Sequence, residues 1–517
     1  MGLDAQRWWH EIRDDYTAND RGSPATTLER IVNKREPFDL IVVGAGTAGL
    51  SCSVTAAGLG LKVAVIEQMR EIGGTLHRTS GFMSAAGTRR QRSQGITDDS
   101  VELHLSDTLS IARRGFNPAL IERAVRSAPE TLDWLDGLGF RFHPDTPAIY
   151  YGHEPFSVPR TYWGEAAGES ILEVIKPLWD RFVADGSIIP YLEHSLGELD
   201  AIAGTVRGVT VADMKSGKIV HLTGRSIVLA TGGFGSNPKM YSKYSSRSAT
   251  PPSAAMPGSQ GAGHLAALAI GAEIRPAKEI LRTGRFALKN DPTRVDLTIQ
   301  ADFDALLRDP REIWVNRQGR RFVDETCHVN TEHEYALLEQ EDQTFWAVFD
   351  QTALLGGKSL IRGWTPEDYA AAAKSDAHTV YSADSIASLA DAAGIHSLGL
   401  IETVDEWNDS VGKRQLWRNG AQMSIQTSPY YAVRCQGAIL TTFSGLWLDE
   451  SQRVLTSSGK PLSNLYAAGE VMGAAACSGE AWVGGMCVTP ALALGRNLAR
   501  DIDQLYRSGE GRVGSLS

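Results

Sequence analysis

Residues 39–49 read Asp-Leu-Ile-Val-Val-Gly-Ala-Gly-Thr-Ala-Gly, and this stretch decides the fold. Its first half is a short apolar run typical of a buried strand, and its second half is rich in glycine. We expect a helix of small residues to follow, up to about Gly60, and then a strand at Lys62-Val-Ala-Val-Ile66. A strand, a helix and a strand in this order predict a parallel sheet.

The glycines are spaced as Gly44-x-Gly46-x-x-Gly49, and Glu67 comes directly after the second strand. Glycines in this turn let a pyrophosphate approach the N-terminus of the following helix closely. The carboxylate of Glu67 stands where it can accept hydrogen bonds from ribose hydroxyls. The strand, the glycine motif, the helix and the acid together predict a dinucleotide site.

NAD and FAD share this fingerprint, so the choice between them depends on other segments. Glu71-Ile-Gly-Gly-Thr75 follows at once, and Ser80-Gly-Phe-Met-Ser-Ala-Ala-Gly87 is a loop of small residues suited to lie along a flavin ring. Near the C-terminus, Asn464-Leu-Tyr-Ala-Ala-Gly-Glu470 places a carboxylate after a strand, within reach of a ribityl chain. This combination favours FAD.

These segments, with Ala230-Thr-Gly-Gly-Phe234 and Pro257-Gly-Ser-Gln-Gly-Ala-Gly263, resemble the flavoproteins of the fumarate reductase and succinate dehydrogenase group. The 3-ketosteroid 1-dehydrogenases belong to that group, and the C-terminal flavin segment resembles them most. The resemblance implies an α/β fold in which a Rossmann-like FAD-binding domain with a parallel sheet is interrupted by an inserted α+β clamp domain. We therefore expect an N-terminal arm at 1–36, FAD-binding parts at 37–275 and 436–517, and a clamp at 276–435.

The residues expected to hold FAD lie in these segments. They are Gly44, Gly46, Ala48, Gly49, Glu67, Gln68, Gly74, Thr75, Ser80, Gly81, Gly232, Gly233, Gly469, Glu470, Thr489 and Leu492. Thr489-Pro490 is typical of a helix start, and in relatives that helix points its positive end at the flavin pyrimidine. Thr75, not His77, aligns with the histidine that binds FAD covalently in some members, so we expect non-covalent FAD.

The substrate side departs from the fumarate reductase pattern. Those enzymes hold a dicarboxylate with histidines and arginines, but Thr441 stands at the place of a ligand histidine and Trp482 at that of an arginine. A His-Pro-Thr element is also missing at the start of the clamp. Trp482 and Thr441 are therefore expected to line a site for a less polar, cyclic substrate.

The sequence offers several candidates for the catalytic acid and base. Counting back from Asn316 places the family's catalytic arginine at Arg308, with Arg311 as its rival; the alternative is that both form surface or salt-bridge contacts. The ketosteroid branch polarises a ketone with a tyrosine and a glycine amide, here Gly485, and removes a proton with a second tyrosine. The candidate tyrosines are Tyr151 and Tyr162, beside Tyr150, Tyr241 and Tyr244, and Arg160 or Arg308 could lower a tyrosine's pKa. Arg160 and Arg311 are also expected to contact the substrate.

Two enzymatic functions follow. The leading hypothesis is a dehydrogenase (desaturase) that takes hydrogens from the α and β positions of a carbonyl compound, a cyclic ketone or keto acid, and passes hydride to flavin N5. The alternative is a reductase of the C=C bond of an unsaturated carboxylate, with Arg308 as proton donor. An electron-transfer subunit and a non-catalytic flavin module are further alternatives. A second dinucleotide fingerprint is lacking, so we expect an external electron acceptor, oxygen or a quinone-like molecule.

Composition narrows the remaining classes. The 517 residues carry a formal net charge of −10, which disfavours nucleic acid partners. The five cysteines show no CxxC pair and no metal-like spacing, which predicts free thiols and no metal site. Neither a secretory signal nor an apolar run of membrane-spanning length is seen, so we expect a cytoplasmic protein.

Overall fold

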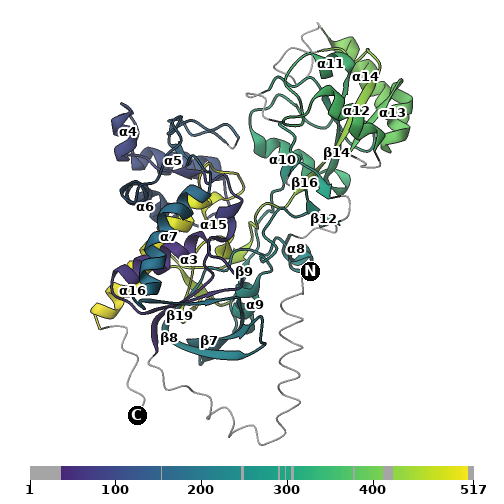
Figure 1. Ribbon diagram of the computed structural model, residues 1–517. Helices are drawn as coiled ribbons and strands as arrows, with labels where there is room; N and C mark the ends of the chain where they lie inside the picture. Colours follow the sequence, from purple (N-terminus) through teal and green to yellow (C-terminus); the bar gives the residue numbers. More distant parts are fainter. Residues whose placement is uncertain are drawn as a thin grey trace, which may run out of the picture.

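The computed structural model describes residues 37–152, 154–245, 250–288, 291–296, 298–303, 308–375, 379–411 and 423–509. The predicted N-terminal arm lies outside these residues. Figure 1 shows two lobes, and we call residues 37–275 and 436–509 the main lobe and residues 276–435 the clamp.

A mainly parallel sheet forms the centre of the main lobe. Its strands β19, β8, β1, β2 and β5 pair in parallel. Their bounds are Pro461–Ala467, Ile219–Leu229, Phe38–Val43, Val63–Glu67 and Ile188–Leu192. β1 and β2 are buried almost along their whole length, which is why they read as continuous apolar runs. Antiparallel strands extend the sheet: β6 (His194–Ile202), β7 (Thr205–Asp213) and β18 (Arg453–Leu455).

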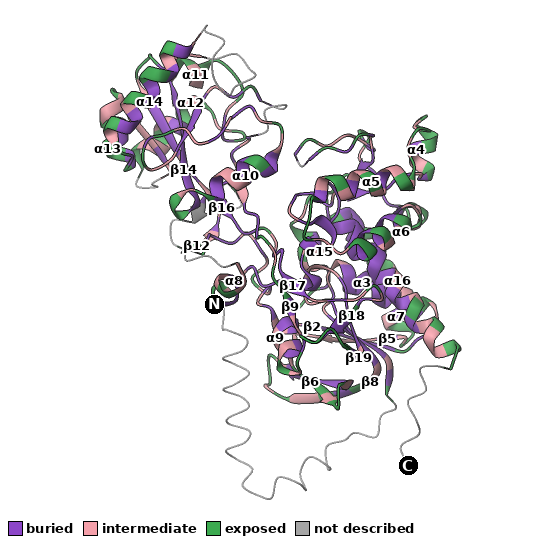
Figure 2. Ribbon diagram, turned by 180° about the vertical axis from the view of Figure 1, so that it is seen from behind, coloured by how far each residue is buried: buried purple, intermediate pink, exposed green. Residues whose placement is uncertain are grey.

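Helices cover one face of this sheet, and Figure 1 shows α3, α7 and α16 lying together there. Their bounds are Thr47–Gly58, Glu169–Ala184 and Val488–Arg507, and α5 (Val101–Ala112) and α6 (Pro118–Gly137) lie beside them. α3 and α16 can approach closely because Gly495 has no side chain. A Cβ at that position would lie only 2.4 Å from the Ser51 hydroxyl. Two apolar clusters fill the interior around the sheet, seen as buried segments in Figure 2.

The clamp is built on an antiparallel sheet in the order β10, β16, β14, β13, with β15 paired to β16. The strands are Arg282–Arg285, Tyr430–Ala438, Thr344–Asp350, Ile313–Val315 and Val380–Ala383. Its helices α10 to α14 span Asn330–Leu338, Gln351–Leu355, Pro366–Lys374, Ile386–Ala393 and Ser397–Ser410. The proposed domain limits remain predictions, since β16 itself crosses residue 435.

Short elements complete the described chain. They are η2 (Gly74–His77), β3 (Met83–Ser84), α4 (Arg89–Ser93), β4 (Thr161–Tyr162), α8 (Pro238–Ser245), α9 (Ala262–Ala269), β9 (Ile274–Arg275), β11 (Ala287–Leu288), β12 (Asp291–Val295), η3 (Glu341–Gln343), β17 (Gly445–Leu446), η4 (Glu470–Met472) and α15 (Ala475–Ser478).

The carboxyl ends of β1, β2, β8 and β19 meet at one edge of the parallel sheet. In open α/β sheets this edge is where ligands bind. All five cysteines are free thiols in this structure. Within the described residues, no helix is long and apolar enough to cross a membrane, and no cluster of acidic, histidine or cysteine side chains has the make-up of a metal site.

Candidate flavin and substrate site

The glycine turn after β1 is locked against two neighbouring strands. Gly44 has a φ of 105°, and a Cβ there would lie 2.3 Å from the carbonyl oxygen of Ala230. Only glycine fits this left-handed position. Gly46 differs, because nothing lies within 4 Å of the place where its Cβ would be. The turn therefore leaves open space at Gly46, where the predicted pyrophosphate would lie.

Glu67 closes the same turn from the end of β2. One carboxylate oxygen accepts the amide hydrogen of Ala45 at 2.7 Å and the other accepts that of Met69 at 2.8 Å. Burial raises the pKa of Glu67, and these amides counteract the effect. The next loop adjoins the turn, because the Gly73 amide donates to the Ala45 carbonyl at 2.8 Å and a Cβ on Gly74 would lie 3.1 Å from Gly46 Cα.

Two helices begin at this edge without a side-chain cap. α3 starts after Gly46, α16 starts after Cys487, and neither first turn contains an acidic residue. Thr489 in the first turn of α16 is fully buried, as is Leu492. Buried helix N-termini with uncapped amides favour an anion or a partly negative ligand atom. Both termini suit the negatively polarised parts of a flavin dinucleotide.

Carboxylate and hydroxyl groups gather at the ends of β8 and β19. Glu470 Oε1 accepts the Thr442 amide at 2.9 Å, and the Thr441 side chain also hydrogen-bonds to Glu470. A Cβ on Gly233 would lie 2.2 Å from this carboxylate oxygen, so the Gly232-Gly233 turn and Glu470 meet directly. Burial raises the pKa of Glu470. The Glu470 segment, which is predicted to contact the ribityl chain, therefore lies beside the Gly232-Gly233 turn.

The other predicted cofactor residues have varied surroundings. Gln68 does not point to an open space, because its Nε2 donates to the Gly258 carbonyl at 2.8 Å and so fixes the 257–263 loop. Thr75 and Ser80 are exposed, and Gly81 is buried against Ala167. Three predicted residues remain. Ala48 and Gly469 lie close together, since a Cβ on Gly469 would come within 2.9 Å of Ala48 Cβ, and Gly49 packs on the glycine turn, where a Cβ would lie 1.8 Å from the Gly44 carbonyl oxygen.

The small-residue loop is tied to the start of α16. Thr489 Oγ1 accepts the Ser84 amide at 2.8 Å and donates to the Ser84 carbonyl at 3.2 Å, across 405 residues of sequence. Gly485 approaches the same loop so closely that a Cβ would lie 2.4 Å from Ser84 N. Its φ is 74°, and it is buried. The segment around Gly485 therefore forms a wall beside the loop predicted to lie along the flavin.

Trp482 completes this wall and is 3% exposed. Its ring meets Phe443 edge to face at a centroid distance of 5.2 Å, in an apolar cluster with Ile280 and Ala475. The buried carboxyl group of Glu334, in the clamp, interacts with Trp482, and burial raises the pKa of Glu334 well above its ordinary value. The position that holds an arginine in fumarate reductases is thus built into an apolar contact between the two lobes.

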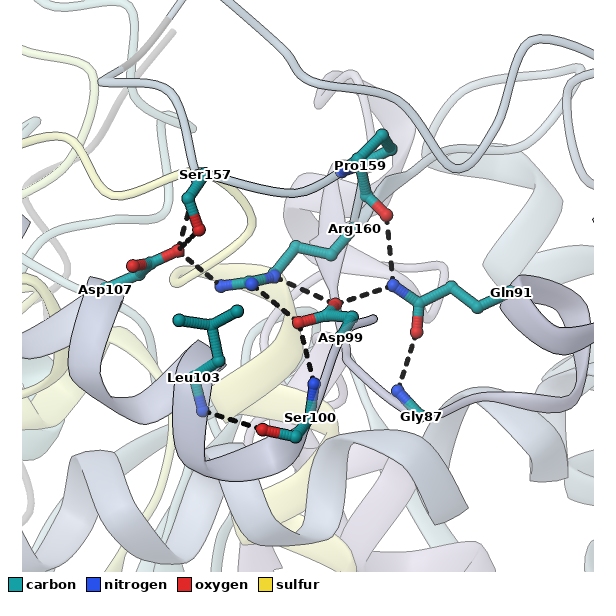
Figure 3. Close-up of polar contacts among 9 residues, drawn as sticks. All are labelled: Gly87, Gln91, Asp99, Ser100, Leu103, Asp107, Ser157, Pro159 and Arg160. Carbon is teal, nitrogen blue, oxygen red and sulfur yellow. Dashed lines mark hydrogen bonds and ion pairs between the residues drawn. The ribbon is translucent and has the colours of Figure 1, made fainter. Parts of the chain in front are cut away.

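Arg160 serves a structural role here, contrary to its predicted contact with substrate. Its guanidinium is fully buried and pairs with Asp99 at 2.6 Å and Asp107 at 2.8 Å. Figure 3 shows both carboxylates converging on it, with Gln91 and Ser157 bound to the same pair. The network fixes the chain that leads into β4, and β4 pairs with the small-residue loop at Met83 and Ser84. Arg160 therefore positions that loop.

The two clamp arginines are also engaged away from this wall. Arg308 forms a buried pair with Glu312, with an Nη1 to Oε2 distance of 3.0 Å, and donates to the Asp302 carbonyl at 2.9 Å. Arg311 lies against the backbone of Gly356 and Gly357. In this structure, Arg308 therefore matches the salt-bridge alternative. Counting along the sequence located both arginines but does not reveal their partners.

The tyrosines fall into different places. Tyr162 is fully buried, its hydroxyl lies 2.7 Å from that of Thr88, and burial raises its pKa, which makes it a poor base. Tyr151 is 41% exposed, and its carbonyl accepts a hydrogen bond from Asn330 of the clamp at 3.2 Å. Tyr150 packs on Phe82 of the small-residue loop with ring centroids 4.2 Å apart. Of these three candidates, Tyr150 is therefore better placed beside the small-residue loop than Tyr151 or Tyr162.

Three buried carboxylates escaped the sequence reasoning. Glu279 accepts the amides of Phe443 and Ser444 at 2.9 Å and 2.8 Å, and burial raises its pKa to about 7. Glu154 and Glu334 lie on either side of the seam between the lobes, and burial raises the pKa of both. A single acidic residue in a polar segment carries no sequence signal of such burial.

Comparisons with known proteins agree with this geometry. The family model described as "FAD binding domain" matches residues 39–485. The chain belongs to this family.

The NADH:fumarate oxidoreductase of Klebsiella pneumoniae (strain 342) is 28% identical over 463 residues, which is 88% of this chain and 46% of that protein. The chain thus spans about half the length of that relative. The 4-oxocyclohex-2-ene-1-carboxylate 5-dehydrogenase of Sinomonas cyclohexanicum is 24% identical, over 92% of this chain and 96% of that protein. A crystal structure of 3-ketosteroid Δ1-dehydrogenase from Sterolibacterium denitrificans, in complex with 1,4-androstadiene-3,17-dione, has a TM-score of 0.73 at 20% identity and covers 91% of this chain and 100% of its own.

The predicted fold class is therefore confirmed. The family resemblance and FAD as the cofactor are confirmed as well, and the protein is an FAD-dependent oxidoreductase. Non-covalent attachment of the FAD stays a prediction. The residues at the sheet edge fit that cofactor, since the open space at Gly46 and the two uncapped helix N-termini provide what a dinucleotide and a flavin ring need.

Proposed function

We propose that the protein is a dehydrogenase (desaturase) that removes hydrogens from the α and β positions of a carbonyl compound, a cyclic ketone or keto acid. The amide of Gly485 is the observation that carries this proposal. Among the described residues, no acceptor meets that amide, although the residue is buried. A buried amide without a partner costs about 1 to 3 kcal/mol. A substrate carbonyl would supply the missing acceptor.

The amide gains most when charge develops on the oxygen it faces. Removal of a proton from the α carbon moves negative charge onto the carbonyl oxygen, so a fixed N–H donor stabilises that state more than the neutral ketone. The backbone at Gly485 cannot rotate away easily, because the residue is held against Ser84 and its carbonyl accepts the Thr489 amide at 3.0 Å. The donor is therefore preorganised.

The walls beside Gly485 favour a substrate of low charge. Trp482 is buried in an apolar cluster, and Thr441 gives its hydroxyl to Glu470. Neither side chain can anchor a carboxylate as a histidine or arginine would. The residues at the sheet edge would hold FAD, which would supply the acceptor for the hydride that leaves the β carbon. We assign removal of the α proton to a tyrosine of the 150–151 segment, with Tyr150 first because it contacts the small-residue loop.

Two features of the cofactor site belong to the same proposal. His77 is engaged through both ring nitrogens, Nδ1 at 2.7 Å from Glu169 and Nε2 at 2.8 Å from the Ile72 carbonyl, which favours non-covalent FAD. Electrons then leave to an external acceptor, oxygen or a quinone-like molecule, and we propose that the protein works in the cytoplasm.

A second candidate is reduction of the C=C bond of an unsaturated carboxylate. The observation in its favour is the relative named NADH:fumarate oxidoreductase, at 28% identity. This reaction requires a cation for the carboxylate and a proton donor. Arg308 is occupied by Glu312, so the clamp would have to rearrange before Arg308 could serve as the donor.

Anaerobic stopped-flow mixing separates the two candidates. The FAD-loaded protein is mixed with cyclic ketones, keto acids and steroids while the visible absorbance of the oxidised flavin is followed. Bleaching by a ketone supports the dehydrogenase. Failure of every ketone to bleach the flavin, together with rapid reoxidation of pre-reduced protein by an enoic acid, supports the reductase.

A further inference from the structure

A pocket lies where the chain passes from the main lobe into the clamp. Its volume is about 240 Å³, and its walls come from the 275–278 segment, from Gly115 and Tyr244, and from Ala475, Gly479 and Glu480. β9 ends at Arg275 and pairs with β17, so one side of the pocket is fixed to the main lobe. Figure 1 shows β9 close to this junction.

Two cations line this pocket without an acidic partner among the described residues. Arg275 and Lys278 form no ion pair there, and the Lys278 ammonium instead lies 3.5 Å from the centroid of the Tyr335 ring. The one carboxylate in the wall, Glu480, is paired with Arg114 at 2.9 Å. The lining is therefore locally positive on a chain whose net charge is −10, which marks it as a place to concentrate an anion.

The size of the pocket limits the anion. Small-molecule sites usually measure about 300 to 1,000 Å³, so a pocket of 240 Å³ is below the range for a nucleotide. Part of its wall is apolar, from Pro276, Ala277 and Ala475, and would suit a carbon skeleton. Arg275 offers the paired N–H donors that match a carboxylate, and the Tyr244 side chain lines the same space.

We propose that this pocket binds a small monocarboxylate with a compact apolar body, held by Arg275 and Lys278. Its wall segment from Ala475 to Glu480 continues directly into Trp482 and Gly485, and Ala475 contacts the Trp482 cluster. A bound carboxylate would therefore contact the segment that leads into the proposed substrate wall. The same chemistry fits the carboxyl group of the substrate itself or a separate acid, and the experiment distinguishes them.

Calorimetric titration of the FAD-loaded protein with benzoate tests the site, with neutral benzamide and inorganic phosphate as comparison ligands at constant ionic strength. We expect saturable benzoate binding with a Kd of about 1 mM and no saturable binding of benzamide. The double variant Arg275→Gln/Lys278→Met should weaken benzoate binding at least about tenfold, as for loss of a charge-assisted contact. The matched control Arg207→Gln/Lys218→Met removes two exposed cations from the β6–β8 region and should leave the Kd unchanged.

The inference fails if benzoate does not saturate, if benzamide or phosphate binds as well, or if the double variant binds like the native protein. Its outcome is independent of the proposed dehydrogenation, because the titration needs no turnover. Competition between benzoate and a ketone that bleaches the flavin would identify the site with the substrate's own carboxyl group. Simultaneous binding of both would identify a separate acid.

Discussion

The nucleotide side and the substrate side of the site are built in different ways. On the nucleotide side, Gly44, Glu67 and Gly74 lie within about thirty residues of one another and interlock through backbone contacts. On the substrate side, Ser84 meets Thr489 across 405 residues, and Trp482 packs against the clamp. The first side is specified by a local motif, whereas the second exists only after the whole chain has folded.

A pair of glycine substitutions would test the nucleotide side most severely. Gly44→Ala forces a Cβ against the Ala230 carbonyl at a φ of 105°, so we expect loss of both FAD and the folded main lobe. Gly46→Ala has free space and should fold with the thermal stability of the native apoprotein, yet bind FAD at least about tenfold more weakly. Differential scanning calorimetry and FAD titration would check both. Equal behaviour of the two variants would contradict the distinction.

The buried Arg160 network should respond more strongly than any surface pair. Arg160→Met leaves Asp99 and Asp107 without their cation, and we expect a loss of about 3 to 5 kcal/mol in the free energy of unfolding. The control Lys176→Met removes an exposed i,i+4 pair with Asp180 and should cost less than about 1 kcal/mol. Urea denaturation measures both. Similar losses of unfolding free energy in the two variants would show that the Arg160 network does not stabilise the small-residue loop.

Glu279 gives the junction of the lobes a pH dependence with a defined sign. Its pKa rises from 4.5 to about 7 on folding, so the folded state binds more protons than the unfolded state between these values. Stability therefore falls as pH rises from about 4.5 to about 7, by about 3 kcal/mol for this group. Glu279→Gln should remove that part of the slope in urea denaturation measured from pH 5 to pH 8. Parallel curves for the two proteins would contradict it.

Adjacent tyrosines offer a test on the substrate side. Tyr150→Phe should lower the rate of flavin bleaching by a ketone about a hundredfold, as for loss of a general base. Tyr151→Phe, whose native side chain is 41% exposed, should change it less than about threefold. Rapid mixing gives both rates, and circular dichroism confirms folding. The reverse order would move the base to Tyr151.

Particular residues show what sequence could and could not reveal. The spacing of Gly44, Gly46 and Gly49 at the start of a helix is enough to place the nucleotide side, because Gly44 and Gly49 each meet a steric need of the local backbone and Gly46 leaves space for the predicted pyrophosphate. Arg308 shows the limit: counting from Asn316 located it, but its partner Glu312 decides its role.

Arg160 and Tyr162 show the same limit. Arg160 is buried with Asp99 and Tyr162 with Thr88. These partners lie dozens of residues away along the chain, so no local sequence pattern predicts the contacts. Tyr150 ranks first among the candidate bases only because of its contact with Phe82, which the sequence does not show.

Deuterium substitution tests the central claim most directly. The ketone that bleaches the flavin fastest is prepared with deuterium at the β carbon, and anaerobic bleaching is compared with that of the unlabelled ketone. If cleavage of the Cβ–H bond reduces the cofactor beside Gly485, the labelled ketone should bleach the flavin several-fold more slowly than the unlabelled ketone. A rate difference of about this size is expected when the bond to deuterium breaks in the rate-limiting step. Equal rates for both ketones, with no deuterium lost from the β carbon in the product, would contradict the account.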